Sequence, residues 1–231
     1  MAADHAFAPY PESSSEAGSS PLDLSDHTLA AEWAELLHDR QLHADVLACS
    51  KQEDYAGAIA RLEELLACRP AASDYNNRGL MHFKLGHYEQ ALADYDLALA
   101  LEPRLDSAYN NRANCYVALG DLASAIADYE IALDFNPGNL RARINQGITY
   151  RDLGLYDLAL ENFDIVLLLG RRLQGRAYAE RGRTHHLQGD WNLAIADYQQ
   201  ALDLLASSRS ARHCAQQVQR WLAELNAPLT A

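Results

Sequence analysis

The chain has 231 residues and a formal net charge of −13 at pH 7. This acidic balance argues against a general nucleic-acid or anionic-membrane binder, because binding to phosphates is driven by lysine and arginine. No stretch of the sequence is long and apolar enough to span a bilayer, and residues 1–10 lack the basic start and apolar run of a secretory signal. We therefore expect a cytoplasmic protein that binds no nucleic acid and does not insert directly into a membrane.

Residues 1–24 are rich in serine, alanine, proline and glutamate. Such a segment carries too little apolar surface to offset the entropy lost on ordering, so we expect a disordered N-terminal tail. After Ser25, apolar residues recur at helical spacing, and this pattern continues to Asn226 with breaks at glycine or proline. The predicted class is all-α, with an ordered region at residues 25–226.

The ordered region repeats itself. Small residues at Ala58, Ala91, Ala125, Ala159 and Ala194 are separated by 33, 34, 34 and 35 positions. Other columns keep the same register: small residues at Gly79, Ala113, Gly147 and Gly182, aromatic residues at Tyr95, Tyr129, Phe163 and Tyr198, and glycines at Gly86, Gly120, Gly154 and Gly189. Two helices approach closely only where side chains are small. Each unit is therefore predicted to be a helical hairpin that stacks on its neighbours.

The segments Tyr75-Asn-Asn-Arg-Gly-Leu and Leu85-Gly-His-Tyr-Glu-Gln-Ala-Leu-Ala-Asp-Tyr resemble the tetratricopeptide repeat family. The resemblance covers about residues 39–208 and implies a right-handed superhelical solenoid of about five helix-turn-helix repeats. These repeats are expected at about 39–71, 72–105, 106–139, 140–174 and 175–208. The first is degenerate, since Val46 replaces the small residue, Glu53 the turn glycine and Leu62 the aromatic residue.

A capping helix is expected at about residues 210–226. Cys214, Val218, Trp221, Leu222 and Leu225 fall on one of its faces at helical spacing. Trp221 either covers the open end of the stack or anchors a partner.

The resemblance implies that the first helix of each hairpin uses one face for internal packing and lines a concave groove with the other. Asn77, Asn111 and Asn145 recur there with a spacing of 34 residues. An asparagine amide carries a donor and an acceptor side by side, so it can pair with the backbone of an extended peptide. The arrangement is similar to the asparagine ladder of O-linked N-acetylglucosamine transferases, which holds substrate polypeptide. Alternatively, these amides bond the neighbouring helix. The predicted peptide-binding residues are Asn76, Asn77, Leu80, Phe83, Lys84, Asn110, Asn111, Asn114, Arg141, Asn145, Ile148, Arg151, Arg176 and Arg183.

The four arginines of this set gather toward the C-terminal half of the groove. They would favour a partner with an acidic segment through bidentate pairing. The alternative is a surface neutralised by Asp152 and Glu180, which lie on the same stripe.

The sequence contains no phosphate loop, nucleophile elbow or two-histidine metal helix, and its four cysteines show no metal-ligand spacing. The pair His185-His186 is expected to be packing. We therefore expect no enzyme activity, no metal and no cofactor. The predicted function is a non-catalytic scaffold or adaptor that binds an extended peptide in the concave groove. The alternative is a regulatory or assembly-factor subunit that docks on an enzyme or membrane protein complex through its convex face or C-terminal end. The identity of the partner and the oligomeric state stay open.

Overall fold

The computed structural model describes residues 26–206 and 212–226, so the tail expected at residues 1–24 lies outside the described part. The chain divides into two compact units, residues 1–40 and residues 41–231. The first unit contributes the beginning of one long helix, α1 (Asp26–Lys51). The second unit carries the repeats.

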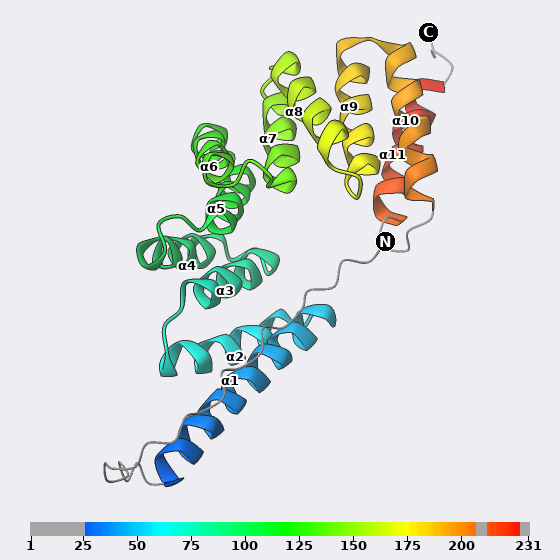
Figure 1. The fold of residues 1–231 in the computed structure, drawn as a ribbon. Helices are drawn as coiled ribbons and strands as arrows, with labels where there is room; N and C mark the ends of the chain where they lie inside the picture. The colour runs from blue at the N-terminus through cyan, green and yellow to red at the C-terminus, as the bar shows by residue number, and fades with distance from the viewer. Residues whose placement is uncertain (1–25, 207–211, 227–231) are drawn as a thin grey trace, which may run out of the picture. The chain divides into compact units, whose positions relative to one another are not determined.

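The described residues form eleven α-helices and no strand, which confirms the all-α prediction (Figure 1). After α1 the helices are α2 (Tyr55–Cys68), α3 (Ala72–Lys84), α4 (Tyr88–Leu101), α5 (Asp106–Leu119), α6 (Leu122–Phe135), α7 (Leu140–Asp152), α8 (Tyr156–Leu169), α9 (Gln174–Gln188), α10 (Trp191–Leu205) and α11 (Arg212–Asn226).

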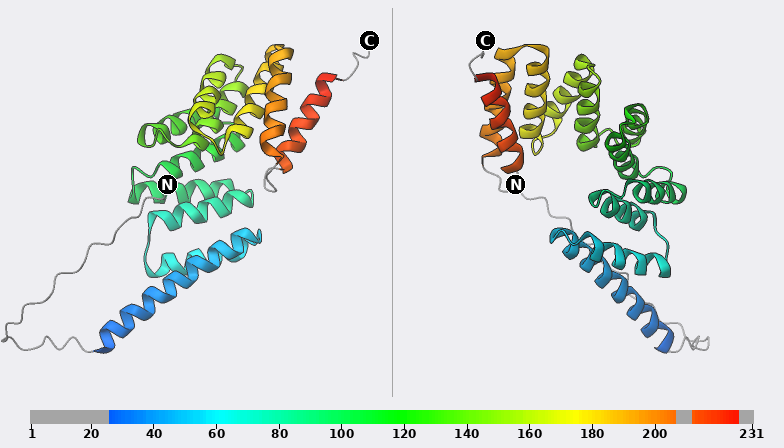
Figure 2. Two further views of the ribbon diagram at one scale, coloured as in Figure 1. Left: turned by 45° about the vertical axis from the view of Figure 1, so that its right-hand side comes forward. Right: turned by 180° about the vertical axis from the view of Figure 1, so that it is seen from behind.

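From α3 onward the helices pack as antiparallel pairs: α3 with α4, α5 with α6, α7 with α8 and α9 with α10. The second helix of each pair packs on the first helix of the next pair (Figure 2). The first helices α3, α5, α7 and α9 also contact one another in turn. Side chains on these four helices can therefore meet across the boundaries between repeats.

The core of each hairpin forms where a small residue meets a buried aromatic ring. Tyr95 is fully buried beside Gly79, where an added Cβ would lie 2.7 Å from the Cε1 atom of the ring. The same contact recurs between Gly147 and Phe163, at 2.8 Å. These close approaches explain why a small residue is followed by an aromatic residue 16 positions later in these repeats.

The turns between paired helices use a left-handed backbone. Gly120, for example, follows α5 with φ 83°. Glu53 occupies the equivalent turn before α2 and has φ 61°, although it carries a side chain. The first repeat therefore keeps the turn geometry of the others at some cost in backbone strain, because this region disfavours residues with a Cβ.

The last helix, α11, packs against α9 and α10. Val218 is fully buried there, and Trp221 stacks on Tyr198 with 5.9 Å between the ring centroids. Leu222 and Leu225 join the same apolar cluster. The helix lies within the range expected for the cap, and its apolar face covers the last repeat.

Candidate functional site

The candidate site is the surface that α3, α5, α7 and α9 share, called here the first-helix surface. All the peptide-binding residues predicted from the sequence lie on these four helices. Lys84 and Arg141 are exposed, Asn76 is buried, and the others are half-buried. Leu80, Phe83 and Ile148 each pack against an apolar cluster of the core rather than standing clear of it.

Asparagine side chains on this surface are hydrogen-bonded to one another from repeat to repeat. The Asn111 Nδ2 donates to Asn76 Oδ1 at 3.0 Å, and Asn111 Oδ1 accepts from Asn110 at 3.1 Å. The Asn145 Nδ2 donates to Asn110 Oδ1 at 3.3 Å and to Asn114 Oδ1 at 3.1 Å. The network therefore joins α3, α5 and α7 through their side chains.

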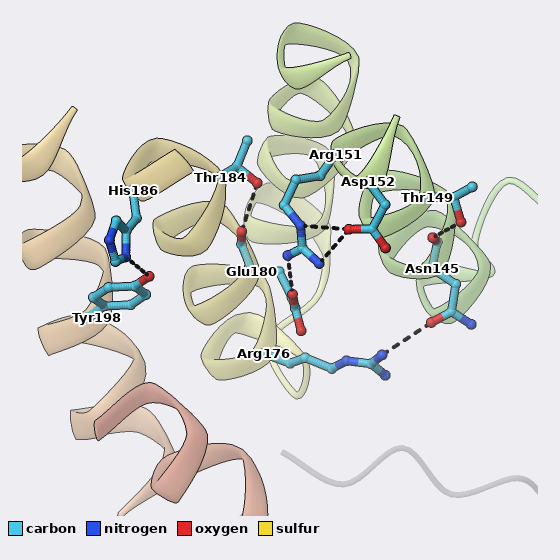
Figure 3. Close-up of polar contacts among 9 residues, drawn as sticks. All are labelled: Asn145, Thr149, Arg151, Asp152, Arg176, Glu180, Thr184, His186 and Tyr198. Atoms are coloured by element: carbon cyan, nitrogen blue, oxygen red, sulfur yellow. Dashed lines mark hydrogen bonds and ion pairs between the residues drawn. The ribbon is translucent and has the colours of Figure 1, made fainter. Parts of the chain in front are cut away.

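These bonds leave the three asparagines of the predicted ladder with different numbers of free hydrogen-bonding groups. An amide has two N–H donors and one carbonyl acceptor. Both donors of Asn145 are used, and its Oδ1 accepts from Arg176 at 3.2 Å (Figure 3). Asn111 keeps one donor, whereas Asn77 makes no side-chain hydrogen bond within the part of the chain that the structure describes. Of the three, Asn77 is the one open to bidentate pairing with a peptide.

The arginines predicted for an acidic partner also divide into two groups. The Arg151 Nη1 donates to Glu180 Oε2 at 2.6 Å, and its other nitrogens reach Asp152 Oδ1 at 3.2 Å (Figure 3). Arg183 pairs with Glu224 of α11 at 2.9 Å and lies over the Trp221 ring. Arg176 and Arg141 have no carboxylate partner among residues 26–206 and 212–226. Of the four arginines, Arg141 and Arg176 thus keep a charge that is free to bind a ligand.

The sequence matches the models of the tetratricopeptide repeat at residues 72–105, 107–139 and 139–212. These matches cover more than half of the chain. The chain belongs to the tetratricopeptide repeat (TPR) family. TPR domains are protein–protein interaction modules, and the fold is typically non-catalytic.

Solved TPR structures share the fold at low sequence identity. A TPR protein of Thermus thermophilus is 20% identical with a TM-score of 0.68, over 78% of this chain and 98% of its own. A MamA structure is 18% identical with a TM-score of 0.59, over 76% and 96%. YrrB, described as a TPR protein with an unusual peptide-binding site, is 20% identical with a TM-score of 0.55, over 74% and 88%. No curated protein matches the sequence significantly.

A second charged feature of these TPR repeats was missed from the sequence. The Arg112 guanidinium binds Asp128 in its own repeat through two bonds, of 2.7 and 2.8 Å, and reaches Asp96 of the preceding repeat at 2.6 Å. Arg181 repeats this arrangement with Asp197 and Asp164. The signal was present as an arginine and an aspartate 16 positions apart, which recurs along the chain.

The TPR repeat formed by α7 and α8 departs from this pattern. Gln146 stands in the arginine column and Asn162 in the aspartate column, and both are buried. The Asn162 Nδ2 donates to the Leu158 carbonyl at 2.9 Å. Neutral side chains thus replace both members of the ion pair. As a result, the arginine column provides no guanidinium that could link α6 to α8.

The histidine pair of the last TPR repeat is part of its packing. The His186 Nδ1 lies 3.2 Å from the Tyr198 hydroxyl (Figure 3), and burial lowers the pKa of His186. Burial also raises the pKa of Tyr198 to about 12. Within residues 26–206 and 212–226, no group of histidine, cysteine and carboxylate side chains is arranged to hold a metal ion. None of the described helices is both long and apolar enough to cross a bilayer.

Proposed function

We propose that the chain is a non-catalytic scaffold or adaptor that binds an extended segment of a partner protein along the first-helix surface. Family membership supports a protein ligand, since TPR domains bind proteins. The observation that carries the proposal is the set of polar side chains on this surface that keep unused bonding capacity. Within the described residues, Asn77 offers an amide without a hydrogen-bond partner, and Arg141 and Arg176 offer guanidinium groups without a carboxylate.

The free groups define the chemistry of the proposed partner. Asn77 would pair with a backbone N–H and C=O, and Arg176 and Arg141 would pair with acidic side chains farther along the segment. Two neutral bonds at roughly 1 kcal/mol each and two charge-assisted contacts at roughly 1.5–3 kcal/mol each sum to about 5–8 kcal/mol before ordering costs. A micromolar complex corresponds to about 8 kcal/mol, so the proposed complex is of micromolar affinity or weaker.

YrrB adds support from outside the chain, because its structure is described as having a peptide-binding site on the same fold. Asn111 and Asn145 would have a different role from Asn77 in this proposal. Their amides hold adjacent repeats together, and they would contact a peptide only by exchanging bonds that already exist.

The test uses the groups that have no internal partner. The full chain serves as bait in its native cell, with cross-linking, and the segment of the captured partner is synthesised as a peptide. The double variant Asn77→Ala, Arg141→Ala is expected to weaken its binding about tenfold in calorimetry, with an unchanged thermal unfolding midpoint. Arg61→Ala on α2 is the matched control, because Arg61 is exposed and lies on a second helix. An unchanged dissociation constant in the double variant would contradict the proposal.

A further inference from the structure

A hollow opens at the turn between α7 and α8, lined by residues other than those of the proposed peptide site. Gly154, Leu155, Tyr156, Asp157, Leu158 and Gln188 line it, and its volume is about 280 Å³. Sites for small-molecule ligands usually span roughly 300–1,000 Å³. The hollow lies at the small end of this range and has room for one or two side chains of a protein.

Leu155 is an unusual residue for its position in this wall. It is the N-cap residue of α8, where its side chain makes no capping hydrogen bond. The equivalent position before α2 is Asp54, which accepts from Gly57 N at 2.9 Å, and before α6 it is Asp121, which accepts from Ser124 N at 3.1 Å. Before α4 and α10 it is His87 and Asp190, whose side chains make no capping hydrogen bond. A leucine here gives up the stabilisation of a cap and stays 46% exposed. Of the five residues at this position of the repeats, Leu155 is the apolar one.

A second large apolar side chain lines the same hollow, and a third follows one of its lining residues closely in the sequence. Leu158, in its lining, is 42% exposed and stands where the earlier repeats have Ser124 and Gln90. Trp191 is 57% exposed and begins α10, three residues after Gln188. Isolated exposed leucines are ordinary on protein surfaces, but apolar side chains gathered around a hollow are typical of binding surfaces. We name Leu155 and Leu158, with the hollow, the turn-edge patch.

The charge around the hollow indicates which kind of partner protein it can bind. Asp157 lines the hollow and is exposed to solvent. Neither a lysine nor an arginine is among the residues that line the hollow. A second copy of this acidic chain would bring the same carboxylates together, and a stable dimer needs about 800 Å² from each partner. A basic partner fits both the charge and the small size of the patch.

We propose that the turn-edge patch docks a partner-protein segment that places an aliphatic or aromatic side chain next to a lysine or arginine. The apolar side chain enters the hollow between Leu155 and Leu158, and the cation pairs with Asp157 at its edge. Large apolar anchors in such hollows carry most of the energy of small interfaces. This site is independent of the first-helix surface and would serve a different partner or a different part of the same one.

The experiment uses two labelled synthetic peptides and the full chain, with fluorescence anisotropy as the readout. One peptide has a central Leu-Trp pair flanked by arginines, and the other has the same pair flanked by glutamates. We expect the basic peptide to bind at least tenfold more tightly. Leu155→Ser is expected to weaken its binding at least fivefold while raising the thermal unfolding midpoint, because serine caps a helix well. Loss of binding in a more stable protein is not explained by misfolding.

Three further variants complete the test. Asp157→Lys is expected to reverse the preference toward the acidic peptide. Leu168→Asp, on the same helix and 82% exposed, is the control and should change binding less than twofold. The Asn77→Ala, Arg141→Ala variant should bind the basic peptide normally, which separates this proposal from the peptide site. Equal binding of the two peptides, no binding of either, or full binding by Leu155→Ser would overturn the proposal.

Discussion

The two carboxylates that hold Arg112 should differ greatly in their contribution to stability. Asp128 is 5% exposed and receives two bonds from the guanidinium, whereas the Asp96 side chain is 62% exposed and receives one. Removing one partner of a buried pair costs about 3–5 kcal/mol, and the exposure of Arg112 itself lowers this to about 2–4 kcal/mol for Asp128→Asn. Asp96→Asn should cost about 0–1 kcal/mol, as for other exposed pairs.

Urea denaturation followed by far-UV circular dichroism measures both losses in the free energy of unfolding. The repeat formed by α7 and α8 supplies the control, because it carries a glutamine and an asparagine in the same two columns. The double variant Arg112→Gln, Asp128→Asn should therefore be more stable than Asp128→Asn alone, since no half-buried cation is left with the exposed Asp96 as its one carboxylate partner. The reasoning is refuted if Asp128→Asn is as mild as Asp96→Asn, or if the double variant is the less stable of the two.

Three other predictions concern residues that shape the turns and the core of the repeats. Glu53→Gly should raise the free energy of unfolding by about 1 kcal/mol in urea denaturation, because glycine adopts the φ of 61° without strain. Gly147→Val should lower it by about 2 kcal/mol or more, because the new Cβ would lie 2.8 Å from the Phe163 ring. Burial lowers the pKa of His82 and His186 in the folded chain. The stability that these neutral histidines contribute is therefore complete above about pH 6.5, the ordinary pKa of histidine, and is lost as the pH falls through their lower folded-state pKa values. Replacing both with glutamine should flatten the fall in unfolding midpoint between pH 7 and pH 5.

The repeat frame could be predicted from the sequence because single residue types decide it locally. A glycine marks a left-handed turn, and a small residue marks a helix crossing that an aromatic ring fills, as at Gly79 and Tyr95. The turn at Glu53 shows the limit of such reasoning. The missing glycine indicated a degenerate repeat, yet the backbone there keeps the geometry of the other turns, because packing of the whole hairpin outweighs the local preference of one residue.

The candidate site was less predictable, because bonding capacity depends on which neighbours a side chain meets. The sequence placed Asn77, Asn111 and Asn145 in one column as equals. In the structure Asn145 has no donor left, whereas Asn77 has both. Nothing in the spacing distinguishes them. The donors of Asn145 are used because Asn110 and Asn114 lie on α5, the first helix of the neighbouring repeat.

This difference bears on where specificity resides in the chain. A residue type that recurs in most repeats serves the common fold, and the columns of Tyr95 and Arg112 accordingly serve packing and ion pairing. A residue that departs from its column at a cost in stability serves something other than the common fold. Leu155 is such a residue, because it gives up a helix cap and leaves apolar surface in water. Specific partners of this chain should therefore depend more on Leu155 than on the recurring Asn111 and Asn145, although the recurring pattern is the more conspicuous in the sequence.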